Sequence, residues 1–437
     1  MFTKAQRCIF ILLILFSSET PYSQNHWPQV SSPTSRELYK CFFTDVLNGW
    51  IVGDSETVLH TSNGGLSWDF QTVPVQCNIH DVVFVNNRLG WAVALDYISI
   101  TTYILKTTNG GAVWNSSVLP DTTKLFESVY FIDSLNGFVG GFNAAMYKTT
   151  DGGVTWIKPS IDNGNFEFYA ISKFSFKTPS TGLACGGINE FGGMICKTTN
   201  SGTNWNCSVI SPVWLRDIVY LDDNRINVVG GEYDLFTAFG KSSDSGSNWD
   251  IDTTFMYFGV GVSLAYRTRA ELWIPAAYSW FVNYDSARAG KWIEMPMTYP
   301  FRYINWALFT DSLHGWAVGN AGGIYKFDTS FIGVNPLSHN IPAEFRLYQN
   351  YPNPFNPVTK IKFDLPAVGT VLRTVRLTVY DILGREVNSL INENLKPGSY
   401  EIEWDGSNCA SGIYFYRLTA GDASSPLSIT KKMVLVK

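Results

Sequence analysis

Short apolar stretches, each bounded by glycine, asparagine or aspartate, follow one another along most of the chain. One unit begins with the apolar stretch 128–133, continues with the glycine-rich stretch 136–141 and ends in a turn at 149–156. Short runs rich in β-branched and aromatic residues, separated by such turns, are typical of antiparallel strands. Each unit therefore predicts four short strands joined by tight turns, which is the content of one β-propeller blade.

The turn segment is the clearest internal repeat. It reads Thr-Ser-Asn-Gly-Gly-Leu-Ser-Trp at 61–68 and returns with substitutions at 107–114, 149–156, 198–205 and 242–249, while an eroded copy ends at Trp292. Asparagine or aspartate hydrogen-bonds nearby backbone and glycine accepts a positive φ, so each copy predicts a tight hairpin turn. The residues to which we assign a structural role in these turns are Asn63, Trp68, Asn109, Trp114, Asp151, Trp156, Asn200, Trp205, Asp244 and Trp249.

The repeats predict an all-β fold with a seven-bladed propeller over residues 24–330. The predicted blades lie at about 38–73, 79–119, 126–160, 168–210, 215–256, 258–297 and 303–330. The last blade contains three strands and no turn tryptophan, whereas segment 25–30 looks like an isolated fourth strand with Trp27. We predict that this segment completes the last blade, because closing the ring removes the exposed sheet edges of an open array.

The turn resembles the Asp-box motif (bacterial neuraminidase repeat), Ser/Thr-x-Asp-x-Gly-x-x-Trp. The whole unit, with Gly-Trp-x-Val-Gly at 49–53 and Lys-Thr-Thr-Asn-Gly-Gly at 106–111, resembles the photosystem II stability/assembly factor-like propeller repeat. Three of the boxes carry Asn in place of Asp, and the last two units have lost the box. The resemblance implies a propeller fold and no particular activity, because hairpin chemistry alone explains the box residues.

The N-terminus predicts a targeting segment. Lys4 and Arg7 precede an apolar run at 8–16, and small or polar residues follow up to Ser23. This run is too short to span a bilayer and is typical of a signal peptide. We predict a signal peptide at 1–23 and no transmembrane segment in the mature chain.

The C-terminal part differs from the repeats. After a predicted linker at 331–344, strands are expected at 359–365, 375–380, 398–404 and 412–419. About 90 residues with this spacing predict a small immunoglobulin-like β-sandwich at 345–437.

Four motifs in this part resemble the type A C-terminal sorting domain of the type IX secretion system. They are Tyr-Pro-Asn-Pro-Phe-Asn-Pro at 351–357, Val-Tyr-Asp-Ile-Leu-Gly-Arg-Glu-Val at 379–387, Gly-Ile-Tyr-Phe-Tyr-Arg-Leu at 412–418 and Lys-Lys-Met-Val-Leu-Val-Lys at 431–437. The resemblance implies that the type IX secretion machinery recognises residues 345–437, exports the protein across the outer membrane and removes this domain. The expected location is then the cell surface or the exterior.

Composition and spacing exclude several classes of site. The net charge is −5 with no basic stripe, so nucleic acid is not an expected partner. The five histidines are dispersed and the cysteines match no ligand spacing, so we expect no metal and no cofactor. Cys185, Cys196 and Cys207 fall on three successive predicted strands, and the sequence leaves open which of the other two pairs with Cys196.

Two classes of function remain. The favoured hypothesis is a non-catalytic recognition or assembly scaffold for glycan or protein. The alternative is a secreted sialidase-like or xyloglucanase-like glycoside hydrolase, and the sequence leaves enzymatic activity undecided. No nucleophile elbow, phosphate-binding loop or zinc-protease motif is present. Asp45, Asp133 and Asp311 lie at corresponding turns, where we expect structural roles.

Aromatic residues predicted on one face of the propeller are the candidate ligand contacts. In this topology, the loops between second and third strands share a face with the loops that join successive blades. Aromatic rings on such loops stack on sugars or anchor peptides, although core packing is the alternative for each of them. The candidate residues are Tyr97, Tyr103, Phe191, Tyr233, Phe236 and Phe239.

Overall fold

Every regular element of the computed structural model is a β-strand, as the sequence predicts. The structure describes residues 26–162, 167–232, 236–252, 259–276, 279–283, 292–297, 303–328, 335–338, 342, 344–366, 373–395, 397–407, 409–420 and 427–437. Among them, no helix has the length and apolar character that a bilayer crossing demands. The predicted signal peptide at 1–23 lies outside the described residues.

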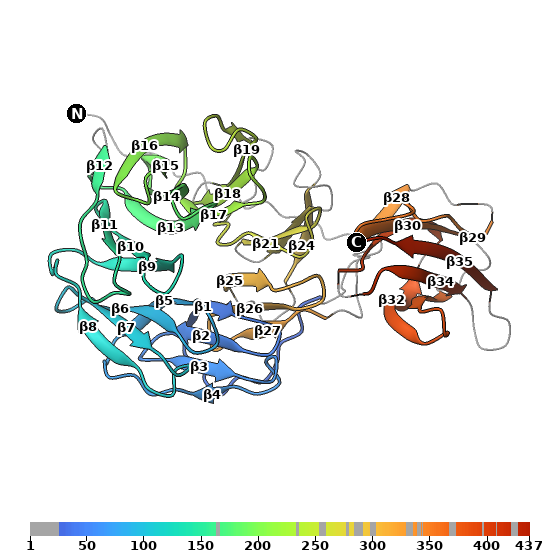
Figure 1. Ribbon diagram of the computed structural model, residues 1–437, viewed down its shortest axis with the longest axis horizontal. Helices are drawn as coiled ribbons and strands as arrows, with labels where there is room; N and C mark the ends of the chain where they lie inside the picture. The colour runs from blue at the N-terminus through green and yellow to red at the C-terminus, as the bar shows by residue number, and fades with distance from the viewer. Residues whose placement is uncertain are drawn as a thin grey trace, which may run out of the picture.

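Seven sheets follow one another around a ring, and we number them as blades 1 to 7 in chain order (Figure 1). Blade 1 contains β1 (Leu38–Phe43), β2 (Gly49–Gly53), β3 (Val58–Thr61) and β4 (Asp69–Phe70). Blade 2 contains β5 (Asn78–Phe84), β6 (Gly90–Asp96), β7 (Thr101–Thr107) and β8 (Asn115–Val118). Blade 3 contains β9 (Phe126–Phe131), β10 (Gly137–Gly141) and β11 (Ala145–Thr149).

Blade 4 contains β12 (Ser160–Asp162), β13 (Ala170–Phe176), β14 (Gly182–Ile188), β15 (Gly192–Thr198) and β16 (Asn204–Ser211). Blade 5 contains β17 (Leu215–Tyr220), β18 (Ile226–Gly231), β19 (Thr237–Ser242) and β20 (Asp250–Ile251). Blade 6 contains β21 (Ala265–Tyr266), β22 (Leu272–Ala276), β23 (Ser279–Asn283) and β24 (Trp292–Pro296). Blade 7 contains β25 (Ile304–Phe309), β26 (Gly315–Gly319) and β27 (Ile324–Lys326).

The blades are joined by a repeated aromatic wedge that explains the Gly-Trp motif. The Phe84 ring at the end of β5 stacks on Trp50 of the preceding blade at 3.6 Å and meets Trp114 edge-on at 5.9 Å. A Cβ atom on Gly90 would lie 2.4 Å from the Phe84 ring, so only glycine fits beneath it. The same arrangement recurs at Phe43, which stacks on Trp316, and at Phe131, which stacks on Trp91. Each wedge buries aromatic surface between two blades, which is the main source of their cohesion.

The described N-terminal segment lies beside the last strand of blade 7. The amide of Val30 donates to the Ile324 carbonyl at 2.9 Å, and the amide of Lys326 donates to the Pro28 carbonyl at 3.2 Å. Trp27 is buried, stacks on Trp280 at 4.6 Å and meets Phe309 edge-on at 5.3 Å. Trp27 thus occupies, in blade 7, the position that the turn tryptophan holds in the other wedges.

Blade 3 has three strands instead of the predicted four. Its outer segment forms a single bridge, in which Lys148 and Ile157 exchange both backbone hydrogen bonds. The ladder would next require a backbone N–H at Pro159, which proline lacks. The chain therefore leaves blade 3, and β12 pairs in parallel with β16 at the outer edge of blade 4.

The fourth blade also contains a disulfide. Cys196 of β15 lies directly opposite Cys207 of β16, and their sulfur atoms are bonded. Cys185 lies buried on β14 as a free thiol. The register of β15 against β16 therefore decides the pairing that the sequence left open.

The C-terminal part consists of two four-stranded sheets. One contains β28 (Asn335–Ser338), β29 (Arg346–Leu347), β30 (Val358–Leu365) and β33 (Gly398–Asp405). The other contains β31 (Arg373–Tyr380), β32 (Glu386–Leu395), β34 (Gly412–Ala420) and β35 (Leu427–Leu435). They enclose a core that includes Val379, Trp404 and Tyr416. Because β28 pairs with β33, part of the segment predicted as a linker belongs to this sandwich.

Removal of the N-terminal segment should destabilise the propeller. Deleting residues 24–31, or replacing Trp27 by Ala, removes the wedge of blade 7 and should cost about 3–5 kcal/mol of unfolding free energy. Thermal unfolding followed by circular dichroism measures the change. Gln29→Ala is the control, because Gln29 lies in the same segment with its side chain exposed. An unchanged melting temperature after the deletion would contradict closure by this segment.

Candidate functional site: an axial cluster on one face of the propeller

The Asp-box residues build their own turns. The Thr61 hydroxyl accepts from the Gly65 amide at 2.9 Å, and the Asn63 side-chain oxygen accepts from the Ser67 amide at 3.0 Å. Gly64 and Gly65 both have positive φ, at 69° and 77°. Equivalent bonds are formed by Thr107 and Asn109, Thr149 and Asp151, Thr198 and Asn200, and Ser242 and Asp244.

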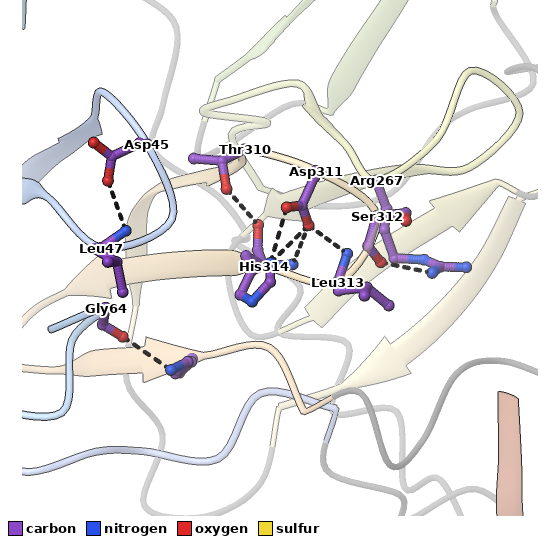
Figure 2. A network of polar contacts seen from close by, with 10 residues as sticks. Asp45, Leu47, Gly64, Arg267, Thr310, Asp311, Ser312, Leu313 and His314 are labelled. Carbon is purple, nitrogen blue, oxygen red and sulfur yellow. Dashed lines mark hydrogen bonds and ion pairs between the residues drawn. The ribbon is translucent and has the colours of Figure 1, made fainter. Parts of the chain in front are cut away.

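The carbonyl groups of these turns accept hydrogen bonds from the preceding blade. The Gly152 carbonyl receives the Trp91 indole N–H at 3.0 Å and the Lys106 ammonium at 2.7 Å. The Lys326 ammonium of blade 7 likewise donates to the Gly64 carbonyl of blade 1 at 2.9 Å, a bond drawn in Figure 2. The Lys and Trp positions of the repeat thus connect blades, and the Asp-box turns serve as structural joints.

The aspartates of the turns between first and second strands are also structural. Asp311 accepts the amides of Leu313 and His314 at 2.8 and 2.9 Å, and Asp45 accepts the Leu47 amide at 2.8 Å (Figure 2). Slight burial alone would raise the pKa of Asp45, but these backbone bonds outweigh it and bring the pKa to about 2. The carboxylate of Asp45 is therefore charged at neutral pH and occupied by its own turn. Asp133 makes the same two backbone bonds in blade 3.

The innermost strands share an irregularity that the sequence analysis missed. Figure 1 shows these strands facing the centre of the ring. In each of β1, β5, β9, β13, β17 and β25, the register against the second strand shifts at the same place. A bulge of this kind re-aims the extra side chain. The residues at the shift are Tyr39, His80, Glu127, Ser172, Arg216 and Asn305.

The residue after each bulge connects neighbouring blades. Asp81 accepts the Val129 amide of blade 3 at 3.1 Å and pairs with the Lys40 ammonium of blade 1 at 2.6 Å. Burial lowers the pKa of Lys40 to about 8, against the opposing effect of the Asp81 carboxylate. Asp217 accepts the Leu264 amide of blade 6 at 2.8 Å. These carboxylates are therefore engaged in holding the ring together.

The bulge residues themselves gather at one end of the propeller axis. Tyr39 stacks on His80 with ring centroids 4.7 Å apart, and the Tyr97 hydroxyl lies 3.1 Å from Nε2 of His80. Burial lowers the pKa of His80 to about 4, so its ring is neutral at neutral pH. Tyr97 belongs to the loop between β6 and β7 and is half exposed. This side of the cluster is an aromatic surface from blades 1 and 2.

The opposite side of the cluster is cationic. The Arg216 guanidinium lies 3.6 Å from the centroid of the Trp214 ring. The Trp214 indole N–H donates to the Ser172 hydroxyl at 2.8 Å, which fixes the ring beneath Arg216. An arginine stacked on tryptophan in this way keeps its positive charge, so this side of the cluster is cationic.

Glu127 carries the remaining charge of the cluster. Within the described part of the chain, its carboxylate makes no hydrogen bond and no salt bridge. Burial raises the pKa of Glu127 to about 7, with Arg216 and Lys40 opposing this shift. A partly accessible carboxylate without a hydrogen-bond donor is a group that a ligand can satisfy. We refer to Tyr39, His80, Tyr97, Glu127, Trp214 and Arg216 as the axial cluster.

The structure separates the predicted aromatic candidates. Tyr97 lies in the axial cluster, Phe191 is 70% exposed on the β14–β15 hairpin, and Phe236 is partly buried next to β19. Phe239 was wrongly placed on the ligand face, because it lies within β19 and is fully buried between blades 5 and 6. Tyr103 lies in β7, half-buried against the core between blades 1 and 2. Tyr233 lies outside the described residues.

A weak sequence signal for the cluster does exist. Near the start of each bulged strand, one apolar residue is followed by two residues that interrupt the pattern, as in Leu38-Tyr39-Lys40 and Ile79-His80-Asp81. The same pattern occurs at 126–128, 171–173, 215–217 and 304–306. Recurrence of this interruption at one place in every unit could have indicated a bulge.

Comparison with known proteins agrees with this architecture. The model of the family "Photosynthesis system II assembly factor YCF48" matches residues 20–125, and that of the "Secretion system C-terminal sorting domain" matches residues 349–436. The propeller repeats are thus similar to those of the YCF48 family over these residues, and the C-terminal part is similar to the sorting domain. A curated relative, the photosystem II assembly lipoprotein Ycf48 of Nostoc sp. strain PCC 7120, is 34% identical over 153 residues. That match spans 34% of this chain and 44% of the relative.

Solved structures show the same fold. YCF48 bound to D1 peptide is 20% identical, with a TM-score of 0.56 over 70% of this chain and 98% of that one. YCF48 from Cyanidioschyzon merolae is 19% identical, with a TM-score of 0.56 over 69% and 98%. An ancestral GH74 enzyme is 13% identical, with a TM-score of 0.53 over 91% of this chain and 60% of that one. At these identities the likeness establishes the fold alone, whereas the sorting domain indicates export to the cell surface or exterior.

Glu127 should make the stability of the propeller pH-dependent. Its raised pKa means that the folded state favours the protonated form, so the contribution of Glu127 to the unfolding free energy should fall as pH rises from about 4.3 to about 7, whereas the lowered pKa of His80 acts in the opposite direction on the total. Glu127→Gln removes the contribution of Glu127, so the unfolding free energy of this variant relative to the native chain should rise by about 1–3 kcal/mol between pH 4 and pH 8. Chemical denaturation at pH 4 and pH 8 measures the unfolding free energy of each protein. Glu190→Gln on the exposed β14–β15 hairpin is the control. If the unfolding free energies of Glu127→Gln and the native chain differed by the same amount at both pH values, the burial of this charge would be disproved.

Proposed function

We propose that the propeller is an exported, non-catalytic recognition or assembly scaffold that binds a peptide segment of a partner protein at the axial cluster. The observation that carries this proposal is the ring of bulges in the innermost strands. Six strands from six blades each deliver one side chain to the same end of the axis. These bulges interrupt six ladders and bring side chains of different chemistry together.

The chemistry of the cluster suits a peptide. A peptide segment offers backbone N–H and C=O groups together with charged and apolar side chains. The Tyr39–His80–Tyr97 surface can hold an apolar or aromatic side chain, Arg216 can donate to a carbonyl or carboxylate, and Glu127 can accept from an N–H group. Glu127 and Arg216 belong to blades 3 and 5, so one extended segment that contacts both would span the inner strand of blade 4.

The comparisons support a protein ligand. A YCF48 structure is described as bound to D1 peptide, so a propeller of this fold can take a peptide as its ligand. Because that likeness is one of fold alone, the identity of the peptide does not transfer to this chain. The sorting domain supports a location at the cell surface or outside it, with the type IX machinery as a second partner that recognises residues 345–437 and removes them.

A glycoside hydrolase is the less favoured reading. Hydrolysis of a glycosidic bond requires two carboxyl groups that face the same bond. Asp81 and Asp217 near the axis accept backbone amides of neighbouring blades, and Asp45, Asp133 and Asp311 are held by their own turns. Because these aspartates are held by backbone amides, Glu127 is left as the carboxylate of the axial cluster, and hydrolysis would need a second one.

Binding to a peptide should depend on both sides of the cluster. The mature chain, residues 24–437, is first screened on a random peptide array and on a glycan array with product analysis. Tyr97→Ser and Arg216→Gln should each lower the affinity for the selected peptide at least tenfold, because each removes one side of the binding surface. Calorimetry measures this affinity. Val154→Ser is the control, since Val154 is 76% exposed on an Asp-box turn at the opposite face.

Three results would count against the proposal. Binding to glycans without any peptide would replace the ligand class, and turnover of a glycan would establish the hydrolase. Equal affinity of all three variants for the selected peptide would remove the axial cluster as the site. Melting temperatures of the variants show whether a loss of binding reflects unfolding.

A further inference from the structure

One leucine recurs in the turn between the first and second strands of several blades. Leu47 in blade 1 and Leu135 in blade 3 each lie two residues after the aspartate that holds this turn, and their side chains are 52% and 53% exposed. Leu313 occupies the same position in blade 7, two residues after Asp311. Leu313 differs from its counterparts, because it is partly buried and packs against the core of the sorting domain.

The partner surface of Leu313 is built from both sheets of the sorting domain. Leu390 of β32 and Trp404 of β33, which are 3% and 2% exposed, line the contact together with Asn388. The cavity that remains there measures only about 20 Å³, which is room for about one water molecule. Leu313 therefore fills a depression at the junction of the two sheets.

Arg267 of blade 6 holds this turn in place. Its guanidinium forms a buried ion pair with Glu271 at 2.5 Å and donates to the Ser312 carbonyl at 2.9 Å (Figure 2). The bond to Ser312 fixes the turn immediately before Leu313. Across the contact, burial raises the pKa of Glu403 on β33, and the positive charge of Arg267 counteracts this rise. The contact thus consists of an apolar side chain on a turn that Arg267 holds in place.

We infer that Leu313 is a docking residue that seats the sorting domain on the turn of blade 7 while the two remain in one chain. Turns between first and second strands lie at the opposite end of an antiparallel sheet from the loops between second and third strands. Docking at Leu313 consequently leaves the face with Tyr97 and the axial cluster uncovered. Figure 1 shows the C-terminal sheets at the flank of the ring, beside the strands of blades 6 and 7. Removal of the sorting domain exposes Leu313 as Leu47 and Leu135 are exposed.

The repeat itself provides the matched control for a test. Leu313→Asp places a charge in the depression, whereas Leu135→Asp places the same charge on the equivalent exposed turn of blade 3. Residues 24–437 and both variants are compared by small-angle X-ray scattering and by hydrogen–deuterium exchange of 388–391 and 401–405. Leu313→Asp should enlarge the radius of gyration and accelerate exchange of these segments several-fold. Leu135→Asp should change neither quantity, and Leu313→Met should retain the compact form.

Two outcomes would overturn docking. The first is a native chain that already has the radius and exchange rates of Leu313→Asp, which would show two independent domains. The second is an equal effect of Leu313→Asp and Leu135→Asp, which would assign the change to the added charge alone. Near-ultraviolet circular dichroism of each variant shows whether the propeller remains folded, so that general unfolding is distinguished from release of the sorting domain.

Discussion

The aromatic wedge between blades is the interaction on which the rest of the propeller depends. A phenylalanine at the end of the innermost strand enters between the second-strand aromatic of the preceding blade and the glycine of its own blade, as Phe84 does between Trp50 and Gly90. The turn tryptophan closes this arrangement from the edge. This apolar contact lies at the opposite end of the innermost strand from the bulge, and the contacts of Asp81 and Asp217 between blades add to it. In blade 7 the edge-on tryptophan is Trp27, which belongs to the N-terminal segment of the propeller.

The contacts that join the blades leave side chains at one end of the axis for a proposed role in binding. The Asp-box carbonyls accept hydrogen bonds from Trp and Lys side chains of the preceding blade. The most conspicuous motif of the sequence therefore serves to join the blades. Asp81 and Asp217 near the axis are likewise engaged by backbone amides. Tyr39, His80, Glu127 and Arg216 occupy the bulges of blades 1, 2, 3 and 5, with chemistry that differs from blade to blade. A repeated scaffold thus carries a surface that is not repeated.

Export and recognition occupy different parts of the chain. The sorting domain has its own apolar core around Trp404 and Tyr416 and contacts the propeller at the turn of blade 7. The axial cluster lies on the face that carries Tyr97. The contact of the sorting domain with the propeller therefore leaves the proposed binding surface unchanged.

The strands, the tight turns, the repeat and the sorting domain could be predicted from the amino-acid sequence. Those features follow from local chemistry, since Asn63, Gly64 and Gly65 specify their turn wherever the chain places it. The bulges at Glu127 and Arg216 and the burial of Phe239 could not be predicted, because they depend on the register between strands and on packing between blades. The tertiary structure also decided that Leu313 is covered while Leu135 is not. Similar turns acquire different roles because only one copy of the turn meets another domain.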